Sequence, residues 1–366
     1  MVFNIVFWDS LIVWLFISVA EAVMPWLTPK SIQFGVRIPP DKIGSSEVLE
    51  PRRSFVMVQL LIAAGAFLGL VLLPLIEGVS WLMTAAPVAV LAASFPNYLR
   101  VRRGLIRLKN SEGWFSGVSQ QTFVEVQDGA EPRVNFLYML PAVAVLLLTV
   151  VVGVDVYPSL PSIIPVHFTA SGQANGFASK SSPEAFTGII MQAVLLVMFT
   201  GIAAAVVRTR RSIESHAPST SLWQQNRFKS IAARMMLLMS FFIGLTLMLS
   251  QFSIWGVIPR ADAALTVIPS LVGVIGLTIP MMRAGQYGSR LKPSANEQGT
   301  GIANVDDDRV WKAGAVYFNR GDRAILVPKR FGVGWTFNFA NPLSWLILAV
   351  IIALPVVLVL IIRFVH

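Results

Sequence analysis

The stretch Asp155–Lys180, DVYPSLPSIIPVHFTASGQANGFASK, separates two long apolar runs and carries the most distinctive pattern in the chain. Proline fixes φ and removes a backbone donor, so this segment cannot form an ordinary helix. Its prolines include Pro158, Pro161 and Pro165. The chain then turns at Gly172. We therefore expect a rigid, proline-rich loop at a membrane face, with His167 and Lys180 as its functional candidates.

The runs on either side of this loop belong to a chain that is 55% apolar and only 13% charged. Soluble domains carry about 25% charged residues, so the composition indicates a membrane protein. A membrane-spanning helix needs about 20 mostly apolar residues. Eight segments meet that length: 4–26, 54–76, 79–99, 136–155, 185–207, 231–251, 263–282 and 342–364. The predicted fold is an all-α integral membrane bundle of about eight transmembrane helices.

Basic residues are distributed unevenly between the two faces of this bundle. Of the 29 basic residues, 26 lie in the segments 27–53, 100–135, 208–234 and 283–330. Loops rich in Lys and Arg stay in the cytoplasm. Both termini and the 156–183 loop are then expected outside, in a multi-pass protein of the cytoplasmic membrane. The expected partner is the lipid bilayer. The net charge of +10 is explained by the basic cytoplasmic loops of a membrane protein, so no nucleic-acid partner is expected.

The predicted organisation has four parts. They are an N-terminal three-span region (1–135), a core membrane region (136–284), a cytoplasmic tail (285–341) and a final helix (342–366). In the tail, AVYFN and AILVP flank RGDR, a pattern that predicts a β-hairpin. About 35 residues cannot bury a core alone, so we expect this β-containing tail to pack on the membrane region or on a protein partner.

Several chemistries are excluded by composition. The chain has no cysteine, which excludes disulfides, a thiol nucleophile and cysteine-ligated metals. Phosphate-loop, dinucleotide-binding and serine-hydrolase motifs are missing from the sequence. We predict no cofactor, no metal and no catalytic residue. The triplet Asp306, Asp307 and Asp308 could ligate a divalent cation, but such a triplet is more often the solvated end of a linker.

Within the proline-rich loop, each candidate has a structural alternative. His167 could sense pH, relay a proton or bind a peptide carboxylate, or it could hold the loop in shape through a hydrogen bond. Lys180 could contact an anion, or it could reach from the interface to water. Asp155 could pair with either residue. A single histidine without a paired carboxylate does not indicate a catalytic site.

Polar groups also occur inside the expected spans. Asp9 and Glu21 lie in the first span, and charges in a membrane often mark a path for ions or substrates. Partial solvation near an interface is the alternative. Gln59, Gln192 and Gln251 are expected to form hydrogen bonds between helices.

The loop motif resembles domain of unknown function 1648, a bacterial membrane family typified by the Sdp immunity protein. Its elements are LP, IP, HF, a glycine and a closing lysine, at Leu160, Pro161, Ile164, Pro165, His167, Phe168, Gly172 and Lys180. The family often has an acidic residue after the glycine, where this chain has Asn175. The resemblance implies that Asp155, Pro161, Pro165, His167, Gly172 and Lys180 form a ligand-binding or switch region.

The tail resembles domain of unknown function 5808, which often accompanies the first domain. The matching elements are W-K, Y-x-N, V-P-K-R-F-G and W-T-x-N, and they contain Trp311, Asn319, Arg330, Trp335 and Asn338. FGVRIP at Phe34–Pro39 resembles the opening of these longer proteins. We expect the aromatic residues of the tail to pack rather than to hold a cofactor.

Together these features favour a non-enzymatic immunity or sensing protein that binds a peptide or amphiphile at the 156–183 loop. The tail would couple that state to the cytoplasm. A small-solute or lipid transporter is the first alternative, because Glu21 lies within a span and Gly273 and Gly276 could allow a bent helix. A membrane-embedded enzyme using Asp155, His167 and Lys180 is the second.

Overall fold

The computed structural model describes residues 5–76, 85–121, 131–168, 173–258, 263–293 and 297–364. These residues form two compact units. Unit 1 comprises Met1–Glu131, Thr209–Phe228 and Met281–Ser344, and unit 2 comprises Pro132–Arg208, Lys229–Pro280 and Trp345–His366. The segment 285–341, called the tail below, therefore belongs to the same compact unit as the N-terminal region.

Six helices in the described residues are long and apolar enough to cross a membrane. They are α1 (Ile5–Leu27), α2 (Ser46–Leu72), α4 (Leu140–Val156), α5 (Thr187–Val207), α6 (Pro218–Ile254) and α7 (Ala263–Ala284). The chain is thus a mostly helical, multi-pass membrane protein. Six of the expected spans are confirmed by these helices.

The expected count of eight spans is not confirmed. The helix in place of the 79–99 span is α3 (Ala86–Ser111), whose second half carries Arg100, Arg102, Arg103, Arg107 and Lys109; residues 77–84 lie outside the described residues. The last helix, α8 (Pro342–Phe364), qualifies only as a shorter apolar helix over Pro342–Ala353.

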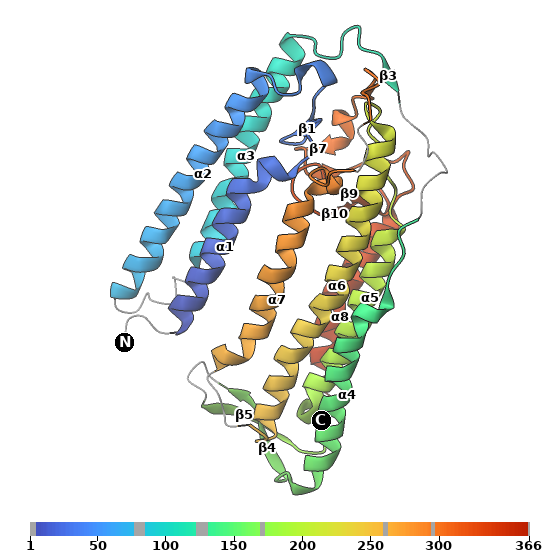
Figure 1. Ribbon diagram of the computed structural model, residues 1–366. Coiled ribbons are helices and arrows are strands. Elements are labelled where there is room, and N and C mark those ends of the chain that lie inside the picture. Colours follow the sequence, from blue (N-terminus) through green and yellow to red (C-terminus); the bar gives the residue numbers. More distant parts are fainter. Residues whose placement is uncertain are drawn as a thin grey trace. The chain divides into compact units, whose positions relative to one another are not determined.

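Unit 1 is built on α1, α2 and α3, which lie side by side (Figure 1). Between α1 and α2 the chain forms a small hairpin of β1 (Ile32–Gln33) and β2 (Val36–Arg37). Its turn is made by Phe34 and Gly35, both at positive φ. A Cβ on Gly35 would lie 2.7 Å from the carbonyl oxygen of Gly314, so only glycine lets the tail approach this turn.

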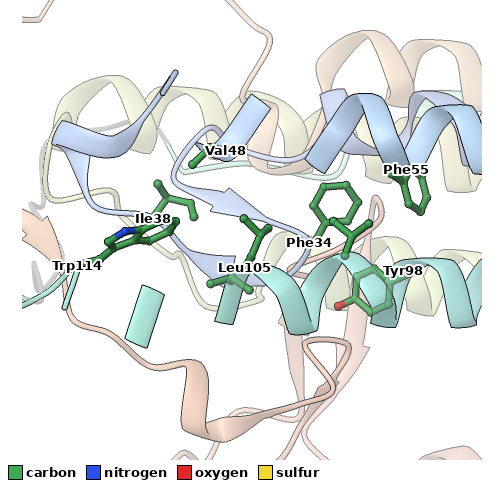
Figure 2. Close-up of a cluster of buried hydrophobic side chains, with 9 residues drawn as sticks. Phe34, Ile38, Val48, Phe55, Tyr98, Leu105 and Trp114 are labelled. Carbon is green, nitrogen blue, oxygen red and sulfur yellow. The ribbon is translucent and has the colours of Figure 1, made fainter. Parts of the chain in front are cut away.

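The largest apolar core of unit 1 surrounds this turn (Figure 2). Its buried side chains come from the first loop, α2, α3 and the turn that follows α3: Phe34, Val36, Ile38, Val48, Phe55, Tyr98, Val101, Leu105 and Trp114. Phe331 of the tail packs against this core, with its ring stacked on Phe34 at 5.6 Å between centroids. Burial of these rings joins the N-terminal loop, two helices and the tail into one core.

The tail forms short β ladders rather than the predicted hairpin. The strands are β7 (Trp311–Lys312) with β8 (Val316–Tyr317), and β9 (Leu326–Pro328) with β10 (Trp335–Phe337). In addition, β6 (Ala303–Asn304) pairs in parallel with β3 (Gln120–Gln121). The predicted pairing of AVYFN with AILVP is therefore wrong.

The physical reason lies in one buried side chain, Asn338. Its amide nitrogen donates to the backbone carbonyls of Asn319 and Asp322, and these two hydrogen bonds stabilise the RGDR turn. Tyr317 forms a bridge to Asn338 instead of pairing with the run after the turn.

Unit 2 contains α4, α5, most of α6 and α7, and a hairpin of β4 (Ile163–Phe168) and β5 (Ala174–Ser179). The hairpin occupies most of the proline-rich loop, at the end of α4 (Figure 1). Ile164 is its buried anchor, packed with Leu160, Ala185, Phe252 and Trp255. The expected proline-rich loop is thus mostly a two-stranded sheet with one face on the helices.

Glutamines connect the helices as expected. Gln59 of α2 donates to the hydroxyl of Ser94 on α3 at 2.6 Å. Gln192 of α5 donates to the hydroxyl of Thr149 on α4 at 3.2 Å. Gln251 of α6 donates to the carbonyl of Ala185 at 2.9 Å. The prediction of hydrogen bonds by these three residues is confirmed, and each satisfies a polar group among apolar helices.

Phe55 provides a test of the core of unit 1. It is fully buried, so Phe55→Ala is expected to lower the free energy of unfolding by about 3–5 kcal/mol through lost burial and a cavity. Phe318→Ala, at a ring 39% exposed in the same unit, is the matched control and should cost far less. Chemical unfolding in detergent measures both; equal losses would contradict this account of the core.

Candidate functional site

The most highly charged part of the described structure lies in unit 1, where the first loop meets the tail. We call it the ion cluster, and its members are Arg37, Lys109, Glu214, Asp306, Asp307, Asp308 and Arg330. Arg37 ends β2, Lys109 lies near the end of α3, and the aspartates precede β7. Direct contacts in this network join residues up to 271 positions apart in sequence.

Asp307 and Asp308 are the centre of the ion cluster. Arg330, only 1% exposed, pairs with both carboxylates. Arg37 Nη2 lies 3.2 Å from Asp307 Oδ1, and the backbone N–H of Arg37 donates to Asp308 at 3.1 Å. Two carboxylates thereby hold two buried guanidinium groups. Buried charges are tolerated only when they are paired in this way.

Lys109 completes the cluster from the side of α3. Its ammonium lies 2.7 Å from Asp306 Oδ1 and 2.6 Å from Asp308 Oδ2. The aspartate triplet is thus engaged by side-chain cations. Among the described residues, no group of acidic and histidine side chains has the arrangement of a metal site.

Electrostatics favour the ionised forms of this network. Burial acts to raise the pKa of Asp307, but the guanidinium groups of Arg37 and Arg330 outweigh it and hold the pKa below its ordinary value. For Arg37, burial acts to lower the pKa, while Glu214 and Asp307 raise it above its ordinary value. Arg37 and Asp307 therefore stay charged across the physiological range.

The tail residues named from the sequence lie close to this cluster or pack beneath it. Trp311 is buried, and the guanidinium carbon of Arg330 lies over its ring at 5.3 Å from the ring centroid. Trp335 stacks on Phe228 at 5.3 Å, and its indole N–H donates to Thr209 at 3.1 Å. The observed contacts of Trp311 and Trp335 are thus packing contacts.

Asn319 supports the turn that follows β8. Its amide oxygen accepts from the N–H of Gly321 at 3.0 Å, and its backbone N–H donates to the side-chain oxygen of the buried Asn338 at 3.1 Å. The structure therefore brings Arg330 and Trp311 together at the ion cluster, while Asn319 and Asn338 shape the neighbouring turn.

Arg37, Lys109 and Glu214 were missed as site residues by sequence reasoning. Arg37 and Lys109 entered only as part of the basic bias of cytoplasmic loops. The available clue was that FGVRIP at Phe34–Pro39 and VPKRFG in the tail both belong to distinctive motifs, and each contributes one arginine to the cluster.

A second candidate surface lies in unit 2 on the β4–β5 hairpin. His167 is exposed on β4, and its ring Nδ1 donates to the amide oxygen of Asn175 on β5 at 2.5 Å. Asn175 is the position at which the resembling family often has an acid. Pro161 is exposed and Pro165 is half-buried within β4, whereas Gly172 lies outside the described residues.

Lys180 is bound to the protein itself. Its ammonium donates to the carbonyl of Leu160 at 2.9 Å and lies 5.2 Å from the ring centroid of Tyr157. These contacts close the base of the hairpin. Asp155 is exposed, and in the described part of the chain it forms no ion pair with His167 or Lys180.

The two charges of α1 are half-buried. Within the described ranges, neither Asp9 nor Glu21 forms an ion pair. Neither residue is therefore a member of the ion cluster of unit 1.

Two family models match parts of this chain, and each match contains residues described above. The family described as "Domain of unknown function (DUF1648)" matches residues 144–193, which span most of α4, the β4–β5 hairpin and the start of α5. The "Family of unknown function (DUF5808)" matches residues 320–345, which include Arg330, Trp335 and Asn338. Each model matches a part of the chain. The resemblance found in the sequence is confirmed.

The two domains cover separate surfaces of this protein. DUF1648 contains the hairpin with His167, and DUF5808 contributes Arg330 to the ion cluster. Neither description assigns an activity. No curated protein and no solved structure matches the chain.

The ion cluster predicts a large effect of Asp308→Asn. This change removes the carboxylate that pairs with the buried Lys109 and Arg330, and breaking a buried pair costs about 3–5 kcal/mol. Asp41→Asn, at an exposed aspartate in the same unit, is the matched control and should be nearly neutral. Chemical unfolding in detergent distinguishes them. Similar stabilities of the two variants would contradict the structural role of the cluster.

The lowered pKa of Asp307 predicts an acid dependence. A carboxylate with a depressed folded-state pKa stabilises the protein above its unfolded pKa of about 3.9, and this contribution is lost as pH falls through the folded-state value. The stability advantage of the wild type over Asp307→Asn should therefore hold above about pH 5 and shrink below about pH 4. Thermal unfolding across this range measures it; a constant difference would contradict the prediction.

Proposed function

We propose that this protein is an immunity or sensing protein of the cytoplasmic membrane, and that its β4–β5 hairpin binds an extended amphiphilic peptide. The observation that carries the proposal is an exposed apolar face on the hairpin. Ile163 is 64% exposed and Phe177 is 63% exposed, although Ile164 on the opposite face is fully buried. We call this side the outer face of the hairpin, and Ser179, which pairs with Ile163, is also exposed there. His167 and Asn175 are exposed at the register shift near the turn end of the hairpin.

The hairpin combines the two kinds of contact that an amphiphile requires. Ile163 and Phe177 offer apolar area, and His167 with Asn175 offers a hydrogen-bonding pair at 2.5 Å. Burying an aromatic side chain supplies much of the free energy of peptide binding. The polar pair would then fix the position of the bound peptide.

The free edge of the hairpin favours an extended ligand. Only two strands form this sheet among the described residues, so each strand has one side without a ladder partner. A peptide can add to such an edge as a third strand. Pro165 lacks a backbone donor on β4, whereas β5 (Ala174–Ser179) contains no proline. The peptide is therefore expected to pair with the free edge of β5.

Two further arguments support this function. The basic residues of the sequence favour an extracytoplasmic position for the hairpin. The domain that contains it matches DUF1648, which the resemblance associates with immunity to a peptide toxin. Lys180 and Ile164 would act as supports that keep the outer face in place rather than as ligand contacts.

The test is survival of a deletion strain that expresses the wild type, His167→Ala, Phe177→Ala or the control Phe318→Ala, exposed to a panel of membrane-active peptides. Phe318 is an exposed aromatic residue in unit 1, away from the hairpin sequence. We expect the wild type and the control to protect against at least one peptide. Each hairpin variant should bind that peptide about tenfold more weakly, the equivalent of about 1.4 kcal/mol.

Membrane levels of all four proteins must be equal for the comparison. Equal protection by the hairpin variants and the wild type would move the binding surface elsewhere. Survival of the deletion strain equal to that of the wild type on every peptide would contradict the immunity function itself.

A further inference from the structure

A cavity of about 280 Å³ lies beside the ion cluster in unit 1. Five arginines and three aspartates line it, together with the aromatic residues Tyr287, Trp311 and Tyr317. Small-molecule pockets range from about 300 Å³ upward, so this cavity suits a small polar group rather than a large apolar ligand.

Arg37 is the main reason to assign a ligand to this cavity. It lines the cavity and is only 5% exposed. Its Nη2 donates to Asp307, but Nε and Nη1 have no hydrogen-bond partner in the described part of the chain. Glu214 attracts Nη1 from 3.5 Å without a hydrogen bond. A buried donor without a partner is costly, and two on one guanidinium are unusual.

The carboxylates around the cavity are already engaged. Asp307 is shared by Arg37 and Arg330, and Asp306 is paired with Lys109. Asp322 accepts from the hydroxyl of Tyr317 at 2.9 Å and pairs with Arg210 at 3.2 Å. The cavity therefore has hydrogen-bond donors on Arg37 that lack an acceptor, and an anion would supply that acceptor.

Arg309 adds a second cation at the rim. Its side chain is exposed, it lines the same cavity, and within the described ranges it forms no ion pair. An arginine presents two parallel N–H donors, a geometry that matches the oxygens of a phosphate. The two unpartnered nitrogens of Arg37, Nε and Nη1, lie on different edges of its guanidinium, so each is a separate donor.

We propose that this cavity binds the phosphate group of a small anion, with Arg37 as the buried contact and Arg309 as the contact at the rim. The phosphate belongs either to a soluble phosphorylated metabolite or to a phospholipid headgroup. This site lies in the tail-containing unit and is independent of the hairpin surface proposed above.

The test uses the full-length protein in a phosphate-free non-ionic detergent. Inorganic phosphate and glycerol 3-phosphate are titrated while thermal unfolding and tryptophan fluorescence are recorded, since Trp311 lines the cavity. Ligand binding to the folded state raises the unfolding temperature. Arg309→Gln should weaken binding about tenfold, because it removes one charge-assisted contact. Arg320→Gln, an exposed arginine in the same tail and outside the cavity lining, is the matched control and should bind as the wild type does.

A second variant separates ligand binding from folding. Arg37→Lys keeps a positive charge near Asp307 but removes the unpartnered Nε and Nη1 donors, so it should weaken the response to phosphate more strongly than Arg309→Gln does. If that variant is too unstable to measure, Arg309→Gln and its control still decide the question. Equal affinities of Arg309→Gln and Arg320→Gln, or a response that chloride reproduces at the same ionic strength, would overturn the proposal.

Nanodiscs of two lipid compositions distinguish a phospholipid headgroup from a soluble phosphorylated metabolite as the ligand. Nanodiscs of phosphatidylcholine and nanodiscs containing phosphatidylglycerol are each titrated with glycerol 3-phosphate. A headgroup in the cavity predicts that phosphatidylglycerol weakens the apparent affinity for glycerol 3-phosphate in the wild type. A soluble ligand predicts equal affinities in both nanodiscs. If glycerol 3-phosphate gives no response in either nanodisc, the proposed site is rejected.

Discussion

The pairing of Asp307 and Asp308 with Arg37 and Arg330 is the contact on which unit 1 depends. It joins a two-residue strand after the first helix to the tail that precedes the last helix. Removing one partner from a buried ion pair leaves an uncompensated charge, which costs about 3–5 kcal/mol. The cluster therefore specifies one arrangement of loop and tail, and the aromatic core around Phe34 and Phe331 supplies the apolar burial beside it.

Unit 2 is held together in a different way. Its helices are connected by apolar packing and by single amide hydrogen bonds, such as those of Gln192 and Gln251. Trp255 and Gln251 both donate to the carbonyl of Ala185, directly below the hairpin. This support lets one face of a two-stranded sheet stay buried while the other displays Ile163 and Phe177 to its surroundings.

How much could be predicted from the sequence differed between these units. Apolar runs are local, so six spans, the bridging glutamines and both domain resemblances followed from residue patterns. The strands β4 and β5 were missed because prolines are poor strand formers, and here the buried Ile164 outweighs that preference. Arg37 and Lys109 resembled ordinary basic loop residues, since nothing local distinguishes a lysine facing solvent from one facing two aspartates 197 and 199 positions away.

That separation in sequence also has a consequence for biogenesis. Arg37 leaves the ribosome long before Asp308, which follows 271 residues later. At 5–20 residues per second, translation of that interval lasts on the order of 15 to 55 s. During this time the first three helices exist without the aspartates that neutralise Arg37 and Lys109. Arg37 and Lys109 therefore gain their aspartate partners only after the tail has been synthesised, so unit 1 is completed late in translation.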